Sequence, residues 1–237
     1  MMMNEHTAKA FDIDLQELTR MVAEMGGLAE KQIADSVDAL VKRDGDRAQR
    51  VVAIDVAIDA LEREIEERAV LTIARRQPMA VDLREIVGAL RLSSDLERIG
   101  DLAKNIAKRV GAISGDFHPQ KLLRGVQHMA ALVLGQVKQV LDSYAGHDLN
   151  KALAVWKGDE EIDAMCTSLF RELLTYMMED PRNIGISTHL LFGAKNVERV
   201  GDHTTNIAET VHFLVRGFNI ADDRPKDDQT SSTLISS

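Results

Sequence analysis

The sequence has few cysteines, few aromatic residues and no long apolar run, and each shortage excludes a class of protein. Its single cysteine, Cys166, excludes an intrachain disulfide framework and a cysteine-rich zinc site, and it is typical of a reducing cytosol. The longest purely apolar run, residues 129–134, is far shorter than the ~20 residues of a membrane span. No signal peptide is visible at residues 1–10. We therefore expect a cytoplasmic protein.

Basic residues and catalytic motifs are also scarce. The chain has 29 Lys and Arg against 38 Asp and Glu, a formal charge of −9 that argues against a nucleic-acid partner and leaves cations and basic protein surfaces open. It contains no phosphate-binding loop, no dinucleotide fingerprint, no Gly-x-Ser-x-Gly motif and no histidine paired with Cys166. We expect a protein that is not an enzyme, with Cys166 in its core.

The hydrophobic pattern predicts an all-α fold. Aromatic residues make up only 4% of the chain, and apolar residues recur at intervals of three and four. Gly26-Gly27 predicts a weakened or bent first helix, and Asp46 is the expected N-cap of the second. The six predicted helices span residues 11–43, 47–76, 79–110, 120–144, 149–178 and 184–217.

The strongest break in the chain, at residues 111–119, separates two halves with the same layout. Helices averaging near thirty residues must pack along their whole lengths. We therefore predict two tandem three-helix bundles, one in residues 1–115 and one in residues 116–217. Residues 218–237 lack periodicity and are expected to form a disordered tail.

A fourteen-residue stretch occurs twice, at residues 95–108 and 101 residues later at 196–209. Seven of the fourteen positions are identical, and both copies contain Glu-Arg-x-Gly-Asp with an Asn four residues further on. Such self-similarity indicates a duplicated architecture. Because residues four apart share one face of a helix, each copy presents a pair of carboxylates.

The preceding helix of each half carries a second acid pair at the same spacing. In the first half, each pair has one acid 19 residues from Pro78 and another 23 residues from it. In the second half, the midpoint between Asp163 and Glu198 falls between residues 180 and 181, and so does the midpoint between Asp159 and Asp202. In an antiparallel hairpin, these spacings place four carboxylates at matching heights, once in each half of the chain. The first acid quartet is Asp55, Asp59, Glu97 and Asp101, and the second acid quartet is Asp159, Asp163, Glu198 and Asp202.

Four converging carboxylates repel one another unless a cation lies among them, so each quartet predicts a metal site. Oxygen ligands suit ferric iron, Mg²⁺, Mn²⁺ and Ca²⁺, and zinc also accepts carboxylates. The Glu-x-x-His signature of di-iron bundles is missing, which argues against oxygen chemistry. His203 directly follows Asp202 and is expected at the surface. Gly100 and Gly201, between the acids of each motif, indicate close helix packing or access for an ion.

These residues resemble the PhoU family of accessory regulators of high-affinity phosphate transport. The likeness covers roughly residues 11–217. It is carried by the doubled Glu-Arg-Ile/Val-Gly-Asp motif together with Met25-Gly-Gly27, Arg76-Gln-Pro78, Asp82-Leu-Arg84 and Leu174-Thr-Tyr-Met-Met-Glu-Asp180.

The resemblance implies a cytoplasmic homodimer that binds multinuclear iron or zinc through the two acid quartets. The ligand chemistry alone leaves Mg²⁺, Mn²⁺ and Ca²⁺ as other candidates. It also implies contacts with the ATPase subunit of the phosphate ABC transporter and with a phosphate-sensing membrane histidine kinase, so that the membrane is reached only through partners. Two other interpretations stay open. One is a carboxylate-bridged metal hydrolase or oxidase, and the other is a helical adaptor whose acids form solvated faces.

Overall fold

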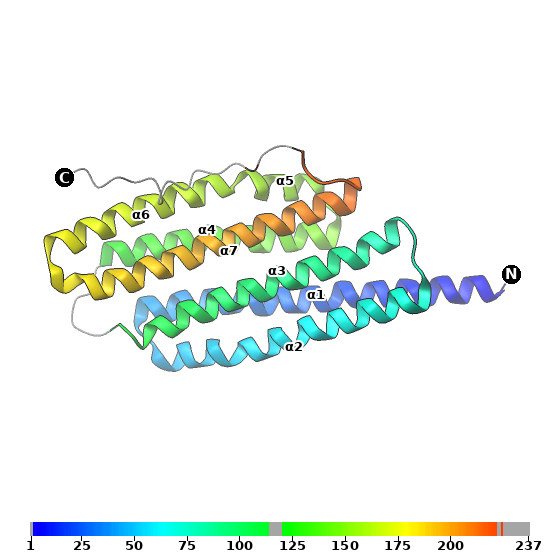
Figure 1. The fold of residues 1–237 in the computed structure, drawn as a ribbon, viewed down its shortest axis with the longest axis horizontal. Coiled ribbons are helices and arrows are strands. Elements are labelled where there is room, and N and C mark those ends of the chain that lie inside the picture. The colour runs from blue at the N-terminus through cyan, green and yellow to red at the C-terminus, as the bar shows by residue number, and fades with distance from the viewer. Residues whose placement is uncertain (1, 114–119, 222–223, 225–237) are drawn as a thin grey trace.

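The computed structural model describes residues 2–113, 120–221 and 224, and within these ranges every regular element is helical. Helices α1–α3 and α4–α7 form two bundles that lie side by side (Figure 1). This arrangement confirms the predicted all-α fold of two tandem bundles. The elements are α1 (Met2–Lys42), α2 (Gly45–Arg76), α3 (Val81–Val110), α4 (Gln120–Gly146), α5 (Leu149–Lys157), α6 (Asp159–Glu179), the 3₁₀ turn η1 (Pro181–Asn183) and α7 (Ile184–Arg216).

Local turn chemistry determines where α2 begins and ends. The side chain of Asp44 accepts a hydrogen bond from the backbone N–H of Arg47, so Asp44 is the N-cap and the prediction of Asp46 is wrong. The helix therefore starts two residues earlier than predicted. It ends at Gln77, which has a left-handed backbone with φ of 49°. Pro78 follows, and its ring and missing N–H are incompatible with a continuing helix.

The single helix predicted over residues 149–178 is interrupted at Gly158, which separates α5 from α6. The backbone N–H of Gly158 donates to the carbonyls of Ala154 and Val155, while its own carbonyl accepts from Gln136 Nε2 at 2.9 Å. The side chain of Gln136 on α4 thus contacts the chain at the point where α5 ends and α6 begins. The new helix begins with Asp159, whose negative charge is favourable at a helix N-terminus.

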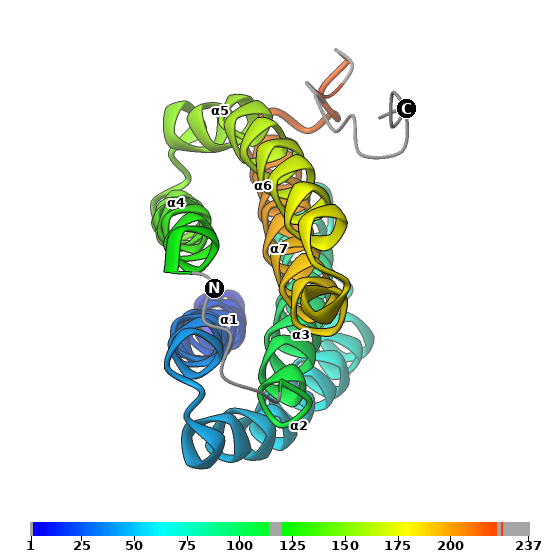
Figure 2. The ribbon, with the colours of Figure 1, turned by 90° about the vertical axis from the view of Figure 1, so that its left-hand side faces the viewer.

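The two bundles meet along α3 with α7 and along α1 with α4, whereas α2, α5 and α6 lie at the outer ends (Figure 2). Two arginines of α3 stack on aromatic rings of α7 across this interface. The guanidinium of Arg91 lies 4.8 Å from the ring centre of Phe213, and that of Arg109 lies 4.5 Å from Phe192. The two copies of the repeated motif therefore lie on neighbouring helices.

A continuous apolar core fills both bundles. Cys166, with 2% of its surface exposed, belongs to this core as predicted. Across the described ranges, none of the helices combines the length and apolarity needed to cross a bilayer. The predicted tail from residue 218 onwards lies outside the described residues except for 218–221 and 224, and so does the predicted boundary at 115/116.

Helix α1 continues without interruption through its two adjacent glycines, which differ in surroundings. A Cβ added at Gly26 would lie 2.8 Å from both Cδ atoms of Leu141 on α4, whereas a Cβ at Gly27 would have no neighbour within 4 Å. Gly26 therefore allows α1 and α4 to approach each other, and Gly27 only weakens the helix.

We predict opposite consequences for Gly27→Ala and Gly26→Ala. Gly27→Ala raises the free energy of unfolding by about 1 kcal/mol, because alanine favours helix and the site is open. Gly26→Ala gains the same helix propensity but displaces Leu141. Its free energy of unfolding is therefore about 1–3 kcal/mol lower than that of Gly27→Ala. Urea unfolding of the two variants measures the difference. Equal stability of the two would contradict the close packing of α1 on α4.

Candidate functional site: two acid quartets

The first acid quartet lies between α2 and α3, with a lysine between two of its acids. Lys104 Nζ lies 2.5 Å from Asp55 Oδ2 on α2 and 2.5 Å from Asp101 Oδ1 on its own helix. Asp55 is buried, with 5% of its surface exposed, whereas Asp59, Glu97 and Asp101 are half-buried. Because one ammonium group reaches both Asp55 and Asp101, the hairpin has the predicted register.

The electrostatics of the first quartet confirm that its members are neighbours. Burial raises the pKa of Glu97, and the charges of Asp101, Asp59 and Asp55 raise it further, while Arg98 opposes them. Burial alone would lower the pKa of Lys104, but its hydrogen bonds with two carboxylates outweigh burial and raise it. The ammonium group therefore stays charged and offsets part of the repulsion.

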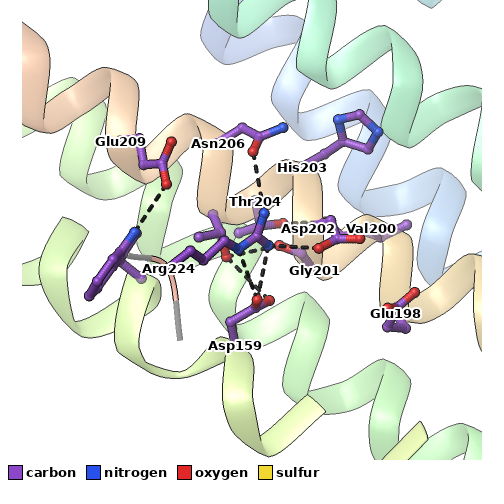
Figure 3. Close-up of polar contacts among 12 residues, drawn as sticks. Asp159, Glu198, Val200, Gly201, Asp202, His203, Thr204, Asn206, Glu209 and Arg224 are labelled. Atoms are coloured by element: carbon purple, nitrogen blue, oxygen red, sulfur yellow. Dashed lines mark hydrogen bonds and ion pairs between the residues drawn. The ribbon is translucent and has the colours of Figure 1, made fainter. Parts of the chain in front are cut away.

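The second acid quartet lies between α6 and α7, and an arginine from beyond α7 lies between two of its acids (Figure 3). Arg224 Nη2 is 2.9 Å from Asp159 Oδ2 and 2.8 Å from Asp202 Oδ1. Asp159, Asp163 and Glu198 are buried, and Asp202 is half-buried. Since Asp159 and Asp202 share one guanidinium group, this hairpin also has the predicted register.

Asp159 is the most buried carboxylate of the second quartet, with 1% of its surface exposed. Burial raises its pKa, Arg224 counteracts this rise, and the charges of Asp163 and Asp202 add to it. Thr205 Oγ1 lies 3.3 Å from Asp159 Oδ1 and 3.1 Å from the carbonyl oxygen of Gly201, so its one proton is shared between these two acceptors. The carboxylate is thus held in a low-dielectric position by one cation and one hydroxyl group.

The glycine of each repeated motif lets its helix approach the partner helix. A Cβ added at Gly100 would lie 3.0 Å from Ile58 Cδ1, and one added at Gly201 would lie 3.2 Å from Ile162 Cδ1. The two isoleucines occupy corresponding places, each one residue before the second aspartate of its pair. Close helix packing accounts for both glycines, and it brings the acids of the facing helices within reach of one basic side chain.

His203, which was expected at the surface rather than among the ligands, is half-buried. Its Nδ1 lies 2.9 Å from Asp95 Oδ1 on α3, and its side chain is 19% exposed. The same oxygen accepts a hydrogen bond from Asn206 Nδ2 at 3.2 Å. The sequence indicated that His203 points away from Asp202, but it did not indicate that the other bundle packs on that side.

Sequence reasoning also missed Lys104 and Arg224, the basic residues that each contact two acids of one quartet, and Lys195, which lies 2.9 Å from Glu198. Lys104 follows Asp101 by three residues, a spacing at which helical side chains meet, so the pattern carried a signal for it. The second copy of the motif has Thr205 at that position. Arg224 carried no such signal, because it lies in the segment predicted to be a disordered tail.

The donor atoms of both quartets fit a hard metal ion in their chemistry. Carboxylates on facing helices that already surround a positive charge are the ligands that such cations prefer. In the described ranges, however, no three carboxylate, imidazole or thiolate groups lie close enough together to hold a metal ion. The positive charge between the acids comes from Lys104 and from Arg224, so metal ligation by the eight acids stays a prediction.

Comparison with known proteins identifies the family. The family model described as the PhoU domain matches residues 22–110 and again residues 126–211. The chain belongs to the PhoU family. Each match contains one acid quartet and one copy of the repeated motif. The duplication inferred from the sequence is therefore a tandem pair of PhoU domains.

PhoU proteins of two bacteria match almost the whole chain. A Rhizobium meliloti (strain 1021) protein named phosphate-specific transport system accessory protein PhoU homolog is 58% identical over 231 residues, with 98% of each chain covered. A protein of the same name from Caulobacter vibrioides (strain NA1000 / CB15N) is 52% identical over 229 residues, which are 97% of this chain and 100% of that one.

Solved PhoU structures share the fold. The crystal structure of PhoU from Pseudomonas aeruginosa superposes with a TM-score of 0.82 at 40% identity, covering 88% of this chain and 100% of that one. The phosphate transport system regulatory protein PhoU from Streptococcus pneumoniae also gives a TM-score of 0.82, at 28% identity, with coverage of 89% and 99%.

We predict that Lys104→Met lowers the free energy of unfolding by about 3 kcal/mol, because it leaves Asp55 buried without its cation. Lys108→Met, which removes an exposed lysine of the same helix, changes it by less than about 0.5 kcal/mol. Urea unfolding in the presence of a chelator measures both variants. Adding Asp55→Asn to Lys104→Met restores part of the loss. If Lys104→Met were as stable as Lys108→Met, the ion pair would contribute nothing.

Proposed function

We propose that this chain is a non-enzymatic accessory regulator of phosphate transport that restrains phosphate uptake and the phosphate-starvation response. The proposal is supported by the match, over 97–98% of the chain, to proteins named as accessory proteins of the phosphate-specific transport system. Both PhoU domains and the whole helical core are included in that match. The proposed role therefore uses the complete two-bundle unit.

The proposed partners are the ATPase subunit of the phosphate ABC transporter and a phosphate-sensing membrane histidine kinase. The chain acts as a cytoplasmic homodimer and reaches the membrane only through these proteins. The net charge of −9 supports docking to basic protein surfaces and disfavours nucleic acid. The name of the relatives, which places them with a transport system, supports the first partner.

The proposed cofactor is a metal ion or cluster at each acid quartet, with iron or zinc first and Mg²⁺, Mn²⁺ or Ca²⁺ as other candidates. The quartets that hold it are those of Asp55, Asp59, Glu97 and Asp101 and of Asp159, Asp163, Glu198 and Asp202. Support comes from the paired aspartates that already converge on one cationic group in each bundle. The metal supplies positive charge that holds two helices together, and the loaded bundle offers a defined docking surface.

Complementation of a strain that lacks this chain tests the proposed function. In phosphate-rich medium, loss of the chain raises expression of a phosphate-starvation reporter, and the unaltered chain returns it to the repressed level. A variant with Asp55→Asn, Asp101→Asn, Asp159→Asn and Asp202→Asn, present at the same level, fails to repress. The control with Glu66→Gln and Glu160→Gln, two exposed acids of the same helices, represses fully.

Two outcomes would overturn this account. An unchanged reporter in the deletion strain would exclude the regulatory role, and full repression by the four-Asn variant would exclude a role for the acid quartets. Phosphatase or oxidase turnover that rises with metal content and disappears in Glu97→Gln would instead favour the metal hydrolase or oxidase.

A further inference from the structure

Arg224 reaches the second acid quartet from outside the bundle. Helix α7 ends at Gly217, whose φ of 82° suits glycine, and the chain then turns back along the helix. Phe218 is held close to this turn, because its carbonyl oxygen lies 3.0 Å from His212 Nδ1 and the two rings meet edge to face. Six residues later, the guanidinium group of Arg224 lies between α6 and α7 (Figure 3).

The guanidinium group is well enclosed at this position. Its Nε donates to Asp159 Oδ2 at 3.0 Å, its Nη2 contacts Asp202, and its Nη1 reaches Asn206 Oδ1 at 3.5 Å. Only 17% of the Arg224 side chain is exposed. Oxygen atoms of Asp159, Asp202 and Asn206, from two helices, thus surround one guanidinium cation, whose Nη2 contacts two carboxylates as an ion pair without an aligned hydrogen bond.

The positive charge between the acids comes from a different part of the chain in each bundle. In the first bundle, Lys104 lies on the same helix as Asp101, one turn further on. The corresponding residue of the second bundle, Thr205, is neutral, and its hydroxyl oxygen lies 3.3 Å from Asp159 Oδ1. The second quartet therefore has no basic residue of its own at this position, and Arg224 takes the place that Lys104 has in the first.

This difference has a mechanical consequence. Lys104 leaves its acids by rotating about its own side-chain bonds, and no backbone has to move. Arg224 lies outside α7 in the sequence, so its departure removes a contact that holds the preceding residues 218–221 near the bundle. Occupation of the second quartet by any other cation is therefore coupled to the position of this segment, whereas occupation of the first is not.

We propose that Arg224 is a tethered cation that fills the second acid quartet and must leave before a metal ion enters, so that metal binding there and the present position of Arg224 and residues 218–221 exclude each other. This inference rests on the proposed metal binding by the quartets. It makes the two sites unequal, because metal binding at the second site changes the position of residues 218–221 and metal binding at the first does not.

The test uses Mn²⁺ alone as the probe and the full chain, with Asp55→Asn and Asp101→Asn present to silence the first quartet. Removing a competitor that occupies the site nine-tenths of the time tightens apparent Mn²⁺ binding about tenfold. Arg224→Ala should give this change in titration calorimetry, and Arg224→Lys a smaller one. Arg216→Ala, which removes an exposed arginine from the last turn of α7, should leave the affinity unchanged. The only tryptophan, Trp156, lies three residues before Asp159 and should respond to Mn²⁺ by a change in fluorescence.

Hydrogen exchange separates displacement of Arg224 from a simple gain in negative charge. With Arg224 present, Mn²⁺ should speed exchange of residues 218–221, and in Arg224→Ala this segment should exchange fast from the start. Equal Mn²⁺ affinity with and without Arg224, or Mn²⁺ binding without faster exchange, would overturn the inference and leave the proposed metal function intact. Absence of Mn²⁺ binding at the second quartet in every variant would overturn both the inference and the proposed metal site there. Titration of Asp159→Asn/Asp202→Asn, in which only the first quartet is intact, would then show whether the chain binds Mn²⁺ at all.

Discussion

Repulsion between carboxylates on facing helices is the constraint on which this fold depends. Each hairpin has an apolar seam that fixes its register, and the same register brings an aspartate of one helix level with an aspartate of the next. Asp55 and Asp159 are almost fully buried, where an unpaired charge is costly. A positive charge between the helices is therefore part of the structure, whether it comes from a lysine, an arginine or a metal ion.

The contact between the bundles connects α3 of the first bundle to the second acid quartet. Both copies of the repeated motif lie on α3 and α7, which pack against each other. Asp95 of α3 contacts His203 and Asn206 of α7, and Asn206 also contacts Arg224. A continuous set of polar contacts thus leads from the first bundle to the cation of the second site. The residue that corresponds to Asp95 in the second copy of the motif is the neutral Asn196. The contacts that the charged Asp95 makes are therefore not repeated by a charged residue in the second copy.

The sequence predicted the helices and the hairpin registers because both follow from periodicity, which is a local property repeated over many residues. The pairing of Asp55 with Asp101, and of Asp159 with Asp202, followed by counting from the turns. The break at Gly158 was missed because it leaves the periodic pattern on both sides intact, and the contact of Gly158 with Gln136 of another helix is not visible in the sequence. Arg224 was missed for a similar reason, since a tail without periodicity gives no sign of where one of its side chains will dock. The surroundings of His203 depend on how two bundles pack, which no short pattern encodes.

Anomalous scattering from crystals of the untagged protein, never exposed to chelator, together with elemental analysis, tests most directly whether the two quartets are cation sites. The account predicts two anomalous peaks, one between α2 and α3 beside Asp55 and Asp101, and one between α6 and α7 beside Asp159 and Asp202, with Arg224 displaced from the second. Crystals without an anomalous peak at either position, with Lys104 and Arg224 still between the acids, would contradict it.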